Sequence, residues 1–262
     1  GVDPSTNGSG AEMVAFLWSA GSHEGDLPTI NTAGSINSTV SVNDAAGFSI
    51  VKYTGNGTDG ATVGHGQSNR PDLIFTKNID ETKDWNVKEF TTMTNDNDRL
   101  ELNDTPAIVT ASSTSFIKST SNSNTITLGD STRVNENGKS HIMYCFRSIS
   151  GYSKIGTYSG NNSAKTVYTT DNGLVGGSNG FKPRWVMLKR TTAVGNWIIW
   201  DSLSNPSADN SNNDVIYANT AGQRSDAGSG RFIAFNSNGF TISGDSGDSN
   251  ASGHTYLYFA IK

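Results

Sequence analysis

The stretch "RPDLIFTKNIDETKDWNV" (residues 70–87) has a second copy later in the chain, "KPRWVMLKRTTAVGNWII" (182–199). Three residue types recur 112 positions apart in the two copies: Pro71 and Pro183, Lys77 and Lys189, Trp85 and Trp197. Each copy reads as two strands around a polar turn, because short β-branched and aromatic runs flank turn-forming residues. Several matches at one fixed spacing are typical of an internal repeat.

The repeat extends beyond these two stretches. "LELNDT" (100–105) aligns with "VIYANT" (215–220) at an offset of 115, so the second unit carries three extra residues after its second tryptophan, Trp197. Upstream, "GFSIVKYTGNG" (47–57) resembles "GYSKIGTYSGNN" (151–162). The unit is therefore about as long as a β-sandwich of roughly 100 residues.

Each unit closes on a glycine followed by an apolar strand, "GKSHIMYCFR" (138–147) and "GHTYLYFAIK" (253–262). The same ending occurs a third time near the start, in "GAEMVAFLW" (10–18). We therefore expect the chain to begin with the last strand of a preceding unit. The four predicted regions are that last strand, a polar connector, repeat 1 and repeat 2, at residues 1–21, 22–46, 47–150 and 151–262.

Composition points to the same fold class. Only 34% of the residues are hydrophobic, 29 are glycine, and no apolar 3.6-residue period extends over three turns. We predict an all-β fold of two tandem antiparallel β-sandwiches, jelly-roll or concanavalin-like, with Trp85 superposed on Trp197 and Tyr144 on Phe259. Because the link at 148–151 is so short, the two units are expected to touch end to end or side by side.

Charge and apolar content exclude several partners. The net charge is −5, and no basic patch could neutralise a row of phosphates, so we expect no nucleic acid. No apolar run approaches the roughly 20 residues that span a bilayer, so no membrane insertion is expected.

The single cysteine, Cys145, is expected to be a small buried hydrophobic residue.

Motifs that suggest an enzyme have a simpler interpretation as loops. Gly55 to Gly60 fit the dinucleotide fingerprint G-x-G-x-x-G, but "ATVGHG" follows, which is a poor start for the required helix. "GGSNG" (176–180) and "GDSG" (244–247) resemble nucleophile motifs without the structural context those motifs need. Asp84 and Glu89 are the only close carboxylate pair on a predicted strand. We therefore expect no catalytic residues and no enzyme activity.

Metal and cofactor binding are not expected either. The four histidines are far apart in the sequence, which argues against zinc. Ca²⁺ remains an alternative at three loops rich in aspartate and asparagine, "NDNDR" (95–99), "DNSNND" (209–214) and "GDSGDSN" (244–250). Such loops are also the ordinary composition of hairpin turns.

The tryptophans are the candidate binding residues. Trp85, Trp197 and Trp200 lie on predicted strands, where an exposed indole would stack on a sugar ring and a buried one would fill the sandwich core. A residue kept in both units at a strand position favours the core for Trp85 and Trp197. Lys77 and Lys189 are expected to extend over apolar surface with their amines in water.

Three segments in fixed order carry a family resemblance: "GFSIVKYTGNGTDGATVGHGQSNRPDLIFTKN", "DWNV" and "NENGKSHIMYCFRS". Together they resemble the tandem concanavalin-like β-sandwiches of virion structural and tail-fibre proteins of tailed, especially marine, bacteriophages. Repeat 2 departs from the pattern, since its "GHG" segment reads "GGSNG".

The resemblance implies a non-enzymatic structural protein at the virion surface, outside the cell. Its expected partners are copies of itself, most simply a trimer as in fibres, other virion proteins, and a host surface glycan or receptor. The alternatives are a carbohydrate-binding module of a secreted bacterial surface protein and a polysaccharide depolymerase.

Overall fold

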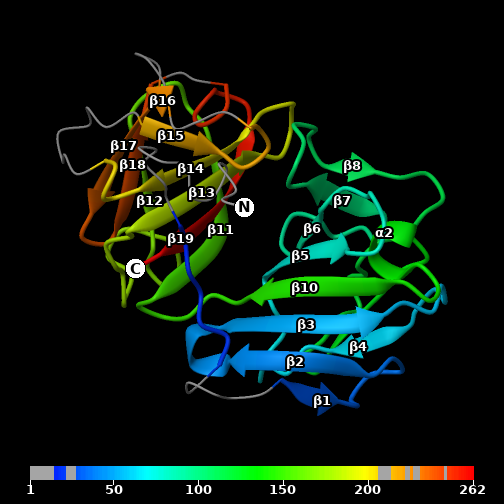
Figure 1. The fold of residues 1–262 in the computed structure, drawn as a ribbon. Coiled ribbons are helices and arrows are strands. Elements are labelled where there is room, and N and C mark those ends of the chain that lie inside the picture. Colours follow the sequence, from blue (N-terminus) through cyan, green and yellow to red (C-terminus); the bar gives the residue numbers. More distant parts are fainter. Residues whose placement is uncertain (1–14, 22–27, 206–213, 222–224, 227–230, 245–246) are drawn as a thin grey trace, which may run out of the picture.

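The computed structural model describes residues 15–21, 28–205, 214–221, 225–226, 231–244 and 247–262. In these residues the protein consists of antiparallel sheets with two very short helical turns, 3-10 helix η1 (Asp44–Ala46) and α-helix α2 (Thr132–Asn135). The predicted all-β fold is confirmed. Figure 1 shows the two halves of the chain as separate sheet stacks that meet near the middle of the molecule.

The first half (residues 28–149) contains one large and one small sheet. The large sheet has eight strands in the order β1 (Thr29–Asn31), β2 (Ser38–Asn43), β3 (Phe48–Thr54), β10 (Ser140–Phe146), β5 (Leu73–Asn78), β6 (Asn86–Glu89), β7 (Asp98–Glu101) and β8 (Val109–Thr110). The small sheet pairs β4 (Thr62–Gly64) with β9 (Thr125–Thr127).

The second half (residues 150–262) also contains one large and one small sheet. Its large sheet has six strands in the order β11 (Ser153–Ser159), β19 (Thr255–Ile261), β13 (Trp185–Arg190), β14 (Trp197–Asp201), β15 (Asp214–Tyr217) and β16 (Ser225–Asp226). Its small sheet contains β12 (Lys165–Tyr168), β18 (Gly239–Ser243) and β17 (Phe232–Asn236) in that order.

The strand registers of the two large sheets agree at the offsets read from the sequence. In the first half Phe75 pairs with both Val87 and Tyr144. In the second half the residue 112 positions later, Met187, pairs with Ile199 and Phe259. Tyr144 and Phe259 therefore occupy equivalent positions in their sheets. The division into two repeat domains at residue 150 stays a prediction, since the two halves also share a core.

Each half has its own core between its large and small sheets. In the first half this core includes Val51, Ile74, Ile126 and Met143, with Cys145 also fully buried as expected. In the second half the corresponding core is built around Trp200 and neighbouring aromatic and branched side chains. Both cores use one face of each strand, because successive side chains of a strand point to opposite faces.

A third core joins the halves, and we call it the inter-sheet core. The opposite faces of the two large sheets form it, so the central strands are buried on both sides. Its principal members are Phe48, Leu73, Phe75, Val87, Leu100 and Phe146 from the first half, and Ile155, Trp185, Met187, Trp197, Ile199, Leu257 and Phe259 from the second. The two halves touch, as the short link led us to expect, and they do so sheet face to sheet face.

The stretch expected to be a connector, 22–46, contributes to the first sheet where the structure describes it. β1 pairs with β2, and β2 covers the edge of β3 from Ser38 to Asn43. Asn43 then caps η1, and Gly47 takes a left-handed conformation (φ 63°) that turns the chain into β3. The polar composition reflects a strand near the sheet edge with one exposed face.

The expected closing strand at 10–18 is not formed over its described part. Residues 15–20, which we call the N-terminal segment, have no strand pairing, and residues 10–14 lie outside the described part of the chain. Phe16 packs against the inter-sheet core instead. Within this segment only Ala20 is buried and Phe16 half-buried, whereas Leu17 and Trp18 are exposed.

The inter-sheet core generates a stability prediction. Phe259 is 3% exposed and its ring lies 4.9 Å from that of Phe146 across the junction. Phe259→Ala should lower the free energy of unfolding by about 3–5 kcal/mol, since it leaves a cavity at a buried aromatic position. Denaturant unfolding followed by tryptophan fluorescence measures this change. Leu203→Ala is the control, because Leu203 is 92% exposed. A loss below about 1 kcal/mol in F259A would contradict burial of this face.

Candidate functional site

The main candidate site is an apolar cavity of about 340 Å³ between the two large sheets, which we call the inter-sheet cavity. Strands from both halves and the N-terminal segment supply its walls. The lining residues are Phe16, Trp18, Phe48, Ile50, Phe75, Trp85, Leu102, Tyr144, Phe146, Trp185, Met187, Ile199 and Phe259. None of them carries a formal charge, and the hydroxyl of Tyr144 is the one ionisable group among them, so the site suits apolar contacts.

The N-terminal segment closes one side of this cavity through aromatic contacts. The ring of Trp18 lies edge-on to Trp185 at 5.7 Å and to Phe146 at 6.0 Å, and Phe16 meets Trp185 at 5.9 Å. Edge-to-face pairs at these distances are favourable beyond the area they bury. Since Trp185 belongs to the second half and Phe146 to the first, Trp18 contacts both sheets at their junction.

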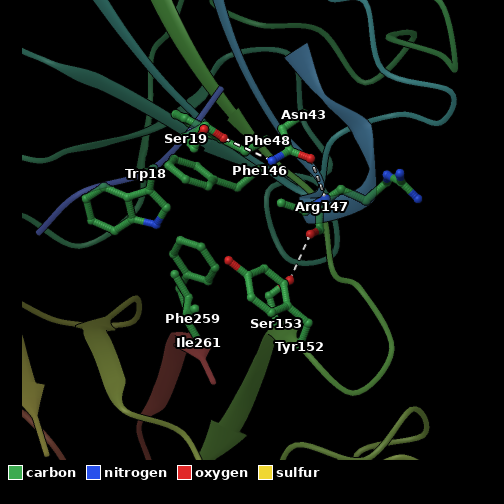
Figure 2. Close-up of a pocket in the computed structure, with 11 residues that line it drawn as sticks. Trp18, Ser19, Asn43, Phe48, Phe146, Arg147, Tyr152, Ser153, Phe259 and Ile261 are labelled. Carbon is green, nitrogen blue, oxygen red and sulfur yellow. Dashed lines mark hydrogen bonds between the residues drawn. The ribbon is translucent and has the colours of Figure 1, made fainter. Parts of the chain in front are cut away.

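A smaller pocket of about 70 Å³ lies next to this segment, and Figure 2 shows the side chains around it. The amide of Asn43, at the end of β2, donates a hydrogen bond to the carbonyl of Ser19 at 3.2 Å. The hydroxyl of Ser153, at the start of β11, donates to the carbonyl of Arg147 at 3.1 Å. These bonds fix the N-terminal segment and the link between the halves beside the inter-sheet core.

The three predicted tryptophans differ in accessibility. Trp197 is 1% exposed in the inter-sheet core and Trp200 is 0% exposed in the second-half core, so neither can stack on an external sugar. The proposal of a glycan contact is therefore corrected for these two residues. Trp85 is half-buried and lines the inter-sheet cavity, with its ring 6.0 Å from that of Tyr144. It is the only one of the three that reaches the candidate site.

Polar contacts connect the two halves beside the cavity. The indole N–H of Trp197 donates to the carbonyl of Glu101 in the first half at 2.7 Å. The loop after β13 and residues 105–108 are also joined backbone to backbone, by Gly195 to Thr105 at 3.0 Å and Ile108 to Thr191 at 3.0 Å. The junction is therefore held by directed bonds as well as by apolar burial.

Lys189 is part of the same junction. Its ammonium donates to the carbonyls of Thr105 at 2.8 Å and Gly195 at 2.7 Å, and the residue is fully buried. Burial lowers its pKa to about 8, because the charged form loses its hydration. The expectation that Lys189 reaches water was wrong. Its repeat equivalent Lys77 is half-buried and bonds to carbonyls of Asn78 and Glu81 in its own loop.

The carboxylates singled out in the sequence do not form a catalytic pair. Asp84 binds Arg133 at 2.8 Å and accepts from Asn103, whereas Glu89 accepts from the backbone of Thr91 and Thr92. Glu89 ends β6 and Asp84 lies two residues before its start, so β6 itself, about 10 Å long, separates them. Carboxylates that cleave a glycosidic bond lie about 5–10 Å apart.

The glycine and aspartate motifs also have structural roles. β4 follows Gly55–Gly60 where a dinucleotide site needs a helix, and the Ser178 hydroxyl donates to Asp171.

Among the described residues no group of three or more His, Cys, Asp or Glu side chains could hold a metal. At 95–99, Asp96 and Asp98 bind Ser119 and Thr110. Most of 209–214 and part of 244–250 lie outside the described residues.

The chain belongs to the family described as Domain of unknown function (DUF7483), which matches residues 2–262. No curated protein and no solved structure matches it. In the part of the chain that the structure describes, no helix is long and apolar enough to cross a membrane.

Sequence reasoning missed the cavity residues Phe16, Trp18 and Trp185. Continuous apolar runs, such as "WVML" (185–188) and "YLYFAI" (256–261), could have pointed to them. A strand with one solvent-exposed face alternates apolar and polar residues instead. Such runs indicate burial on both faces, but they do not say what covers the second face.

Lys189 generates a pH prediction. A lysine with a pKa of about 10.5 unfolded and about 8 folded binds fewer protons in the folded protein between these values. The free energy of unfolding should therefore rise with pH above 8, by up to about 1.4 kcal/mol per pH unit for this residue. Lys189→Met should remove that increment. Chemical denaturation at pH 8.0, 8.5 and 9.0 measures the two slopes.

The comparison between wild type and Lys189→Met cancels the other groups that titrate nearby. Lys88 shares the behaviour, with a pKa lowered to about 8 by burial, and both proteins keep it. The thiol of Cys145, whose pKa burial raises to about 12, acts in the opposite direction above pH 9 and is also common to both. Equal slopes in the two proteins would contradict a buried Lys189 ammonium.

Proposed function

We propose that the chain is a non-enzymatic structural module of a tailed-phage virion, within a tail fibre, spike or capsid-attached fibre. It would act in assembly and in adhesion to the host surface, outside the cell. The observation that supports this most is the inter-sheet core, which unites two polar-surfaced sandwiches in one fixed arrangement. The resemblance of the sequence to virion structural proteins points the same way.

A fixed arrangement suits an appendage that transmits force or positions a receptor contact. Domains joined by a flexible linker move relative to each other by default, unless their interface is large and apolar. Here the apolar core is reinforced by the Trp197–Glu101 bond and by Lys189, which bonds to loops of both halves. The loops at the outer ends of the sandwiches remain available for contacts.

Self-association is supported by the edge of the second sheet. In the first half, β2 and β1 lie beyond β3, whereas its equivalent β11 ends the sheet among the described strands. β11 is seven residues long. Residues 148–149 bond to its outer edge at Ser153 and Ile155, and the part of the edge beyond Ile155 is a template for another strand. We therefore propose that β11 pairs with a second copy of this chain.

A carbohydrate-binding module is the second candidate, and the position of Trp85 favours it. Trp85 is half-buried at the cavity, so part of its ring is accessible. The surrounding wall is almost entirely hydrocarbon, which would leave the hydroxyl groups of a bound sugar without partners. The separation of Asp84 and Glu89 gives the depolymerase alternative no support.

Labelling of whole particles tests the main proposal. Antibodies raised against the folded chain should bind purified phage particles from the source culture, and electron microscopy should place them on the tail or on fibres. Antibodies that bind bacterial cell surfaces and no particle would contradict the virion role. Glycan binding that Trp85→Ala abolishes, together with that result, would favour the second candidate.

The β11 edge gives a separate prediction for solution. Thr157 lies at the middle of β11, where alternation in the pairing with β19 directs its N–H to the free edge. Thr157→Pro should turn an oligomer into a monomer, because proline has no N–H and blocks the edge. Light scattering after size-exclusion chromatography measures the mass. Thr157→Val keeps the N–H and should keep the oligomer. A wild-type monomer at high concentration would overturn the pairing.

A further inference from the structure

We propose that the small pocket beside the N-terminal segment binds the acetamido group of an N-acetylated sugar at the host surface. We call it the Trp18–Tyr152 pocket, after the two aromatic residues at its rim. The proposal rests on the adhesion role proposed above, and it names the class of ligand and the place of contact.

The size of the pocket limits the group that can enter it. Its volume is about 70 Å³, and one water molecule needs about 10–15 Å³ of such space. By that measure a group of about five non-hydrogen atoms fits, whereas a whole sugar ring with its substituents does not. A larger ligand must therefore insert one substituent and leave its ring at the rim.

The walls combine a buried apolar side with an exposed rim. Phe48, Phe146 and Phe259 form the buried side, while Trp18 and Tyr152 are 36% and 37% exposed. Figure 2 shows the indole nitrogen of Trp18 and the hydroxyl of Tyr152 directed inward from opposite sides of the pocket. Such side chains offer apolar contact area and a polar tip, which suits a ligand that is part hydrocarbon and part polar.

The two polar tips of the rim are available to a ligand, since neither forms a hydrogen bond within the described part of the chain. Other polar groups beside the pocket are already bonded, the Asn43 amide to Ser19 and the Ser153 hydroxyl to Arg147. The guanidinium of Arg147 turns away and binds Asp44 at 3.0 Å. The pocket therefore offers one N–H donor and one hydroxyl, and no charged side chain among its lining residues is directed into it.

An acetamido group matches these features and stays within the size limit. Its methyl group would contact the apolar side of the pocket. Its carbonyl oxygen would accept from the indole of Trp18, and its N–H would donate to the hydroxyl of Tyr152. The sugar ring that carries the group would lie against the exposed parts of the two aromatic rings.

The rim is held in place on both sides. Trp18 is fixed by its edge-on contacts with Phe146 and Trp185. On the other side, the backbone of Tyr152 donates to Ile149 at 2.9 Å and accepts from Lys262 at 2.9 Å. Binding groups that are already ordered lose little conformational freedom when a ligand arrives, which favours affinity.

Two matched glycosides test the proposal: methyl N-acetyl-β-D-glucosaminide, and methyl β-D-glucopyranoside, which has a hydroxyl in place of the acetamido group. Each is titrated into the full chain and followed by saturation-transfer NMR. We expect the N-acetylated glycoside to bind about tenfold tighter, with its acetyl methyl protons receiving most of the saturation. Trp18→Phe and Tyr152→Phe should each weaken it about fivefold, because each removes one hydrogen-bonding group.

A control variant and a third probe complete the test. Tyr168→Phe also removes a tyrosine hydroxyl, but Tyr168 lies on β12 and does not line this pocket, so the affinity should not change. Free acetamide should bind about tenfold more weakly than the N-acetylated glycoside, because it has no ring to contact the rim. Circular dichroism should show that each variant remains a folded β protein.

Several results would overturn the proposal. Wild type that binds neither glycoside, or both equally, would show that the pocket does not select an acetamido group. Equal losses in Tyr152→Phe and Tyr168→Phe would place the contact elsewhere. Acetamide that binds as tightly as the glycoside would exclude a role for the sugar ring. None of these results changes the labelling of particles, so failure of the pocket and failure of the virion role are distinguishable.

Discussion

The burial of two sheet faces against each other is the interaction on which this structure depends. Strands β5, β10, β13 and β19 direct alternate side chains into the core of their own half and into the inter-sheet core. A sheet with an aromatic outer face would expose a large apolar patch to water, which monomeric soluble proteins rarely do. Each half buries the outer aromatic face of the other.

The polar groups at this junction are satisfied only where a loop backbone reaches them. The chain at 101–105 crosses from the first half and offers carbonyls to Trp197 and Lys189. Trp185, at the other end of the neighbouring strand β13, meets aromatic rings instead. The same apolar surroundings thus account for a lysine of lowered pKa and for a donor without a partner.

The differences between the halves matter for function as much as their likeness. β2 closes the edge of β3, while β11 has no such neighbour among the described strands. Lys77 bonds within its own loop, whereas Lys189 bonds to the other half as well. One half is therefore complete at its edge and the other is suited to a partner. The proposed pairing of β11 with a second copy would use this difference between the two sheet edges.

The sequence by itself determined the strand content and much of the strand order. Matches at offsets of 112 and 115 recur in the pairing of Phe75 with Tyr144 and of Met187 with Phe259, so equivalent residues of the two halves take the same register. Tertiary structure alone decided what covers the outer faces. That choice depends on the shapes of side chains more than 100 residues apart, and it leaves Trp197 buried, Trp85 half-buried and a cavity beside Trp185. No local pattern carries that information.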